Sequence, residues 1–205
     1  MRRFVVIGQR ATASPDFSLV DVPGTSGRLD VLLRCLRAAL LVSHGLRRDT
    51  VVYLVLLGGE RAPRTLRFDG AAAKYLRPDE RHLATTVQKA LATPSAEGTF
   101  ATFTMLRPGI ARVDRGLDAV LDDLGDGARY VLDEGGADVR DAVLDLARPV
   151  FFVGDHLGFD PPTRARLAEL GAAPIALGPV GMQADDAIVV ASNELDRRVH
   201  AGATR

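Results

Sequence analysis

Residues suited to ligand binding occur in three glycine-bearing segments, each of which directly follows an apolar run. The segments are Leu132-Asp133-Glu134-Gly135-Gly136, Gly154-Asp155-His156 and Leu177-Gly178-Pro179-Val180-Gly181-Met182. Glycine lets a ligand or another backbone approach closely. If the apolar runs are parallel strands, their carboxyl ends meet at one sheet edge, where open α/β sheets bind ligands. The pattern therefore predicts a nucleotide-like ligand at that edge.

Several other kinds of chemistry are excluded by missing motifs. The chain has neither the glycine fingerprint of dinucleotide-binding folds, nor a phosphate-binding P-loop, nor the nucleophile turn of α/β-hydrolases. The four histidines show no metal-ligand spacing, and the single cysteine, Cys35, lies on an apolar helical face. We expect no metal site, and we expect Cys35 to be a core residue.

Basic residues are concentrated in the first half of the chain. Residues 1–100 carry 15 Lys and Arg against 9 Asp and Glu, whereas residues 101–205 carry 11 against 17. Arg28 and Asp30 open an expected helix, and Arg61, Arg64 and Arg67 follow an expected strand in an apparent loop. Arginine forks grip phosphate and stack on bases, so this half could face RNA; a merely solvated charged surface is the alternative.

The chain length of 205 residues suits one domain. We expect a single domain over residues 1–205, with a basic half at about 1–98 and a ligand-binding half at about 99–205. No apolar run approaches the roughly 18 residues that a membrane span needs, so we expect a soluble, cytoplasmic protein.

Alternating apolar segments predict an α/β fold, a mostly parallel sheet with helices on both faces. Strands are expected at 4–8, 51–57, 66–68, 100–106, 129–132, 150–153 and 174–177. Helices are expected at 29–46, 78–91, 117–124, 139–146 and 161–170. The tail can be read as a strand at 187–191 or as a helix at 184–199, and periodicity does not decide between them.

The chain resembles the TrmY family of tRNA pseudouridine N1-methyltransferases, which belongs to the knotted SPOUT superfamily. The resemblance lies in the order of segments 4–19, 27–31, 43–49, 75–81, 130–136, 149–159, 174–182 and 193–198. It implies a C-terminal trefoil knot, a homodimer, a helical tail and a bound S-adenosyl-L-methionine (SAM). The cofactor-binding residues would be Leu132, Gly154, Leu177, Gly178, Pro179, Val180, Gly181, Met182 and Ala187.

The resemblance also implies an activity, methylation of N1 of a pseudouridine, with tRNA position 54 as the expected target. Arg28, Arg61, Arg64 and Arg67 would bind RNA, and Asp30 would orient or accept the N1 proton. The same chemistry on ribosomal RNA is a second possibility.

Two positions depart from the family pattern. Ala187 replaces a cysteine that contacts the cofactor in many relatives, and Ser192 replaces a histidine. These changes keep open a catalytically weak RNA-binding homologue.

Overall fold

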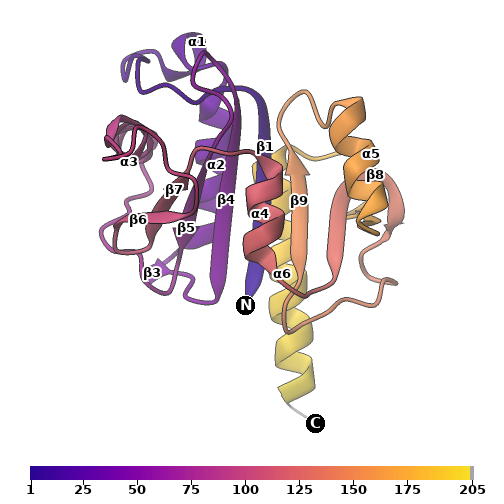
Figure 1. The fold of residues 1–205 in the computed structure, drawn as a ribbon. Coiled ribbons are helices and arrows are strands. Elements are labelled where there is room, and N and C mark those ends of the chain that lie inside the picture. The colour runs from indigo at the N-terminus through magenta and orange to yellow at the C-terminus, as the bar shows by residue number, and fades with distance from the viewer. Residues whose placement is uncertain (204–205) are drawn as a thin grey trace.

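An eight-stranded sheet forms the centre of the computed structural model, which describes residues 1–203 (Figure 1). Its strands lie in the order β10–β8–β9–β1–β4–β5–β7–β6. Their bounds are β1 Arg2–Thr12, β4 Thr50–Gly58, β5 Arg64–Asp69, β6 Thr104–Arg107, β7 Ile110–Val113, β8 Arg129–Asp138, β9 Val150–Gly154 and β10 Ala173–Ala176. A small hairpin pairs β2 (Leu41–Val42) with β3 (Gly45–Leu46).

The expected mostly parallel sheet is confirmed for the five strands from β10 to β4, which all pair in parallel. The remaining three strands, β5, β7 and β6, are antiparallel. The links between β4 and β5 and between β6 and β7 are too short for a crossover, so each must be a hairpin. The parallel part brings the ends of β8, β9 and β10 together at one edge.

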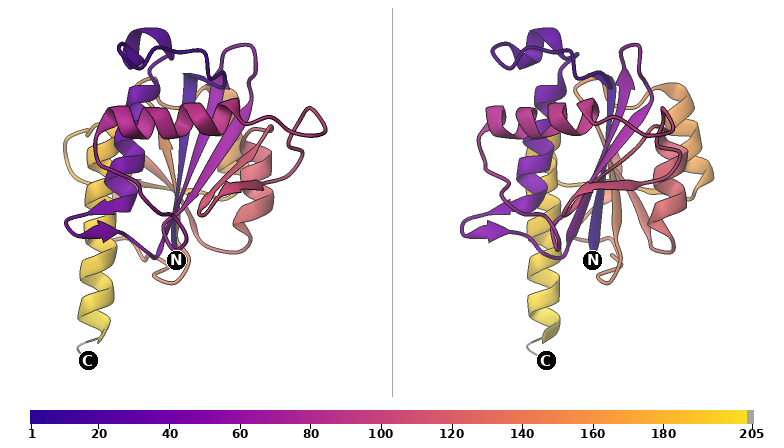
Figure 2. Two further views of the ribbon diagram at one scale, coloured as in Figure 1. Left: turned by 90° about the vertical axis from the view of Figure 1, so that its left-hand side faces the viewer. Right: turned by 60° about the vertical axis from the view of Figure 1, so that its left-hand side comes forward.

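Helices cover both faces of the sheet, as the alternation of elements predicts (Figure 2). One face packs against α2 (Leu29–Leu40), α3 (Glu80–Ala92) and α6 (Ala184–Ala203). The other face packs against α4 (Leu117–Leu124) and α5 (Pro161–Glu169). Successive side chains of a strand point to opposite faces, so Phe4 and Val6 join the first core while Val5 and Ile7 join the second. A short helix, α1, spans Val22–Thr25.

The tail is helical, which confirms the structure that the resemblance implied. Helix α6 packs along α2 and buries Ile188, Ala191 and Leu195. One of its charged residues, Asp196, also joins the helix to β1 and to the link between β3 and β4. Asp196 accepts hydrogen bonds from Arg2 at 2.8 Å and from Arg47 at 2.9 Å. No helix within residues 1–203 has both the length and the apolar character needed to cross a bilayer.

The helix expected at 139–146 is wrong, because this segment is irregular. Its backbone carbonyl groups bond to a side chain instead of to a helical turn. Arg198 donates to the carbonyl oxygens of Ala142 at 2.7 Å, Val139 and Arg140. A side chain from outside the segment, Arg198, thus binds carbonyl oxygens that a local helix would have paired with its own N–H groups.

Three further expectations need correction. The helix expected at 29–46 ends at Leu40, where the chain turns into the β2–β3 hairpin. The strand expected at 100–106 begins only at Thr104, and β7 was missed.

Candidate functional site

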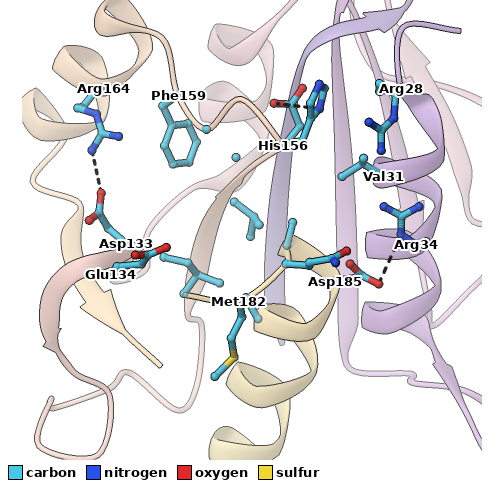
Figure 3. Close-up of a pocket in the computed structure, with 18 residues that line it drawn as sticks. Arg28, Val31, Arg34, Asp133, Glu134, His156, Phe159, Arg164, Met182 and Asp185 are labelled. Atoms are coloured by element: carbon cyan, nitrogen blue, oxygen red, sulfur yellow. Dashed lines mark hydrogen bonds and ion pairs between the residues drawn. The ribbon is translucent and has the colours of Figure 1, made fainter. Parts of the chain in front are cut away.

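A cavity of about 650 Å³ lies between the middle of β8, the loop that follows β9, and α2 (Figure 3). It is lined by Arg28, Val31, Arg34, Leu132, Asp133, Glu134, Val153, Gly154, Asp155, His156, Gly158, Phe159, Arg164, Met182, Gln183, Ala184, Asp185 and Ala187. The wall thus combines residues from both halves of the chain, with α2 on one side and the strand loops on the other.

The first wall exists because β8 breaks register with β10. Pro174 pairs with Val131, whereas the next residue, Ile175, pairs with Ala137. The residues in between leave the β10 ladder, and Leu132, Asp133 and Glu134 reach the cavity.

The second wall is the loop that follows β9, held by the side chain of Asp155. This carboxylate is almost fully buried, and it accepts hydrogen bonds of 2.8 Å from the backbone N–H groups of Gln9 and Leu157. A Cβ atom on Gly154 would lie 2.8 Å from the backbone of Gly158. Glycine is therefore required at position 154 by this close approach of two backbone segments.

A smaller cavity of about 110 Å³ adjoins the first and is formed mainly by the loop after β10. Its lining comprises Leu132, Asp133, Glu134, Ile175, Leu177, Gly178, Val180, Gly181, Met182 and Ala187. Five residues line both cavities: Leu132, Asp133, Glu134, Met182 and Ala187. Of the nine residues expected to bind the cofactor, eight line one or both cavities, and Pro179 lines neither.

The third wall is the start of α2, with Arg28 just before the helix and Arg34 within it. The side chain of Ser26 accepts a 3.1 Å hydrogen bond from the N–H of Leu29, the first residue of this helix, a group that has no partner within the helix. Arg28 precedes the helix in the left-handed region, with φ 68°. This conformation is uncommon for a residue other than glycine and places Arg28 in the cavity wall.

Asp30 lies behind these two arginines rather than in the cavity lining. Its carboxylate, 4% exposed, accepts hydrogen bonds from Arg28 Nε at 3.0 Å and from Arg34 Nη1 at 2.8 Å. Burial raises the pKa of Asp30, but the hydrogen bonds from both arginines outweigh burial, and the net pKa is below its ordinary value. Asp30 is therefore held ionised as the shared anchor of two cations.

The cavity contains charges of both signs. The side chain of Arg164 donates a 2.8 Å hydrogen bond to Asp133, and this bond lowers the pKa of Asp133. Arg34 Nε lies 3.7 Å from a carboxylate oxygen of Asp185, on the first turn of α6. The close-up shows these pairs on opposite sides of the cavity (Figure 3). Such a wall can bind a zwitterion or hold a cation between carboxylates.

The remaining expected RNA-binding arginines lie apart from one another. Arg61 is exposed in the loop between β4 and β5. Arg64 and Arg67 are not in a loop, since both belong to β5. Arg64 is largely buried and lies 3.0 Å from Asp114, while Arg67 lies 3.5 Å from Asp123. A spacing of three places them on opposite faces of the strand.

Ser192 and the charged segment 193–198 also lie outside both cavities. Ser192 is 2% exposed, and its backbone carbonyl accepts a hydrogen bond from Arg2. Asp196 and Arg198 fasten neighbouring segments, as described above. The departure at Ser192 thus lies in the packing of α6, whereas the departure at Ala187 is in the cavity wall.

Sequence reasoning missed several residues of the wall. Arg34 follows Asp30 by four residues, a spacing that pairs charges on one helical face and could have revealed it. Phe159 and Arg164 come from the loop after β9 and from α5, and no local pattern distinguishes them.

Comparison with known proteins agrees with this architecture. A curated relative from Halobacterium salinarum is 44% identical, covers 96% of each chain and is named tRNA (pseudouridine(54)-N(1))-methyltransferase. A relative of the same name from Methanosarcina acetivorans is 38% identical over 96% of this chain and 92% of its own. The crystal structure of Archaeoglobus fulgidus Nep1 bound to S-adenosylhomocysteine has a similar fold, with a TM-score of 0.62, 15% identity and coverage of 96% and 97%.

The sequence profile of one family matches residues 1–200, nearly the whole chain, and that family is described as SAM-dependent RNA methyltransferase. The match and the full-length relatives lead to one conclusion: the chain belongs to the family of SAM-dependent RNA methyltransferases.

Proposed function

We propose that this chain transfers a methyl group from SAM to N1 of pseudouridine at position 54 of tRNA. The observation that carries the proposal is the shared wall of the large cavity, where loops suited to the methyl donor face two arginines of α2. The names of the full-length relatives support the reaction and the target nucleotide.

The residues present fit SAM. The small cavity offers apolar side chains, Ile175 and Leu177, beside the backbone of a glycine-containing loop, which suits adenine. In the large cavity, Asp133, Glu134 and Asp185 could face the positive sulfonium and amino groups, and Arg164 could face the carboxylate. When bound, SAM supplies a methyl group that its sulfonium already activates, so the protein's task is mainly alignment.

The acceptor base would lie against α2. Arg28 presents a guanidinium to the cavity and could hold a phosphate or a base edge of the RNA. Asp30 touches the cavity only through Arg28 and Arg34, which favours a positioning role over direct acceptance of the N1 proton. Both of its oxygens are already hydrogen-bonded and its pKa is lowered, so it would be a weak base.

The wider architecture of the family is part of the proposal. We infer that the chain folds as one domain, since β1 pairs with both β4 and β9 and so joins the two halves. The C-terminal loops would form the trefoil knot, and two copies would form a dimer. Arg61, exposed in its loop, remains a candidate for RNA contact, as do Arg64 and Arg67 once their ion pairs are exchanged. A tRNA substrate would place the chain in the cytoplasm.

The experiment that tests the proposal compares two tRNA transcripts that differ only in pseudouridine or uridine at position 54. Each is incubated with methyl-labelled SAM, and nucleosides are then separated by mass. N1-methylpseudouridine should form only from the pseudouridine transcript. Parallel reactions contain ribosomal RNA, and calorimetry measures SAM binding. Label in ribosomal RNA but not in tRNA would show that ribosomal RNA is the substrate. SAM binding without label in any RNA would overturn the proposed activity.

A further inference from the structure

We propose that Tyr75 is a stacking platform for a base of the RNA, at a place separate from the cavity. The inference rests on the proposed RNA substrate and adds a second contact to it. Tyr75 lies in the link between β5 and α3, and its side chain is 88% exposed. The other two tyrosines, Tyr53 and Tyr130, are 2% and 5% exposed.

The backbone holds Tyr75 in a conformation that aromatic residues rarely adopt. Its φ is 60°, and Arg28 is the only other residue besides glycine with positive φ among residues 1–203. A bulky side chain in this region marks local strain, which persists where the surroundings determine the conformation. No packing of the ring within residues 1–203 compensates for it, since the ring is exposed.

The surroundings do determine this conformation. The ring Nε2 of His82, on α3, lies 2.9 Å from the backbone carbonyl oxygen of Tyr75. The chain just before Tyr75 is held by Arg48, which donates hydrogen bonds to the carbonyl oxygens of Gly70 at 3.0 Å and of Ala73 at 3.3 Å. After it, Leu76 packs against the core. The loop is therefore fastened on both sides of an exposed ring, and a pre-ordered ring loses little freedom on binding.

The charge near this ring favours RNA over a protein partner. Lys74, Arg77 and Arg81 are exposed, and within residues 1–203 none of them pairs with a carboxylate. Of the two acids nearby, Asp79 is occupied as the cap of α3, where it accepts from the N–H of His82 at 2.8 Å. An aromatic face among cations is the combination that binds single-stranded nucleic acid by stacking and phosphate contact.

Helix α2 lies between α3, the helix that follows the Tyr75 loop, and the C-terminal helix α6. It packs against α3 on one side and α6 on the other, and both neighbours cover the same face of the sheet (Figure 2). The cavity opens at the end of α2 that carries Arg28. An RNA held at Arg28 and at Tyr75 would therefore cross α2, and the stacked base would not be the methylated one.

The test uses a tryptophan as reporter, because the chain contains no tryptophan. Tyr75→Trp keeps an aromatic face, and its fluorescence should be quenched on titration with the pseudouridine-54 tRNA transcript. Val143→Trp, at a position 93% exposed, is the control and should respond weakly. If tRNA leaves the fluorescence of the Tyr75→Trp protein unchanged, the proposal is contradicted. A protein partner would then be the explanation for the exposed ring.

A pair of substitutions separates stacking from backbone effects. Tyr75→Phe keeps the ring and should bind tRNA as the wild type does. Tyr75→Gly removes the ring and suits positive φ, so it should fold normally, bind SAM normally and bind tRNA about 5- to 100-fold more weakly. Equal tRNA affinity of both variants would overturn this inference while wild-type methylation of the transcript stands. A wild type that neither binds nor methylates tRNA would overturn the proposed function and this inference together.

Discussion

Arg34 donates a 2.8 Å hydrogen bond to the buried carboxylate of Asp30, one helical turn earlier on α2. The same carboxylate holds Arg28, so one buried anion sets the position of two cations in the cavity wall. Removal of the negative charge should therefore disturb both arginines at once.

Asp30→Asn tests this dependence. The amide cannot hold two guanidinium groups as the carboxylate does, so the rate of methyl transfer should fall by about 10- to 100-fold through misplacement of Arg28. The free energy of unfolding should fall by about 1–3 kcal/mol. Single-turnover methylation and urea denaturation measure the two effects. Asp186→Asn, an exposed acid on α6, is the control. Full turnover of the Asp30→Asn protein would refute the role of Asp30.

The stability of the protein should depend on pH through Asp30. Its pKa is lower in the folded state than the ordinary 3.8, so its contribution is fully present above that ordinary value. The contribution is lost as the pH falls below 3.8 and through the folded pKa. Urea denaturation of the wild type and of Asp30→Asn should therefore show a difference in stability that narrows below pH 3.8. A difference that stays constant across this range would contradict the assigned pKa direction.

Arg198 should stabilise the segment that follows β8, because its guanidinium binds three backbone carbonyl groups there. Arg198→Ala should lower the free energy of unfolding by about 1–3 kcal/mol and weaken SAM binding, since the adjoining strand carries Leu132. Thermal denaturation and calorimetry provide the measurements. Arg197→Ala, an exposed arginine beside it, should change neither quantity. Identical results for the two variants would show that the hydrogen bonds of Arg198 to these carbonyl groups do not stabilise the protein.

Gly154→Ala should weaken SAM binding by roughly tenfold, because the new methyl group would meet the backbone of Gly158 and distort the cavity wall. Gly135→Ala is the matched control. Its Cβ would find its nearest atom, Asp133 Oδ1, at 3.4 Å, and it should bind SAM within about twofold of the wild type. Calorimetric titration with SAM distinguishes them, and normal affinity of the Gly154→Ala protein would exclude the loop after β9 from the binding site.

Much of the parallel part of the sheet could be predicted from local patterns. Apolar runs such as 150–153 are uninterrupted and bounded by glycine or proline, and helix 117–124 has the predicted bounds. The break in β8 could not be predicted, since it depends on how Pro174 and Ile175 meet a distant strand. The irregular segment after Val139 depends likewise on Arg198, nearly 60 residues away. Long-range contacts of this kind leave no local periodicity.

The candidate site follows the same division. The loops after β9 and β10 were predictable because each follows its own strand, and Arg28 was predictable from the start of its helix. The loop expected at 132–136 was wrong, because this segment lies within β8. The loop placement of Arg64 and Arg67 was wrong, because an arginine-rich segment can pair as a strand when its charges find partners such as Asp114 and Asp123. Arg164 of α5 reaches the wall beside Asp133 of β8, to which it donates a hydrogen bond, and Phe159 reaches it from the loop after β9; both positions depend on the tertiary fold.

The central claim is that one cavity holds the methyl donor against β8 and the loops after β9 and β10, and the acceptor base beside α2. The most direct test is to measure SAM affinity and the single-turnover methylation rate for Arg28→Gln, with Arg37→Gln, an exposed arginine of α2, as control. We predict that Arg28→Gln binds SAM within about threefold of the wild type but methylates pseudouridine-54 tRNA about 10- to 100-fold more slowly. An unchanged rate, or a loss of SAM binding in parallel with the rate, would contradict this division of the cavity.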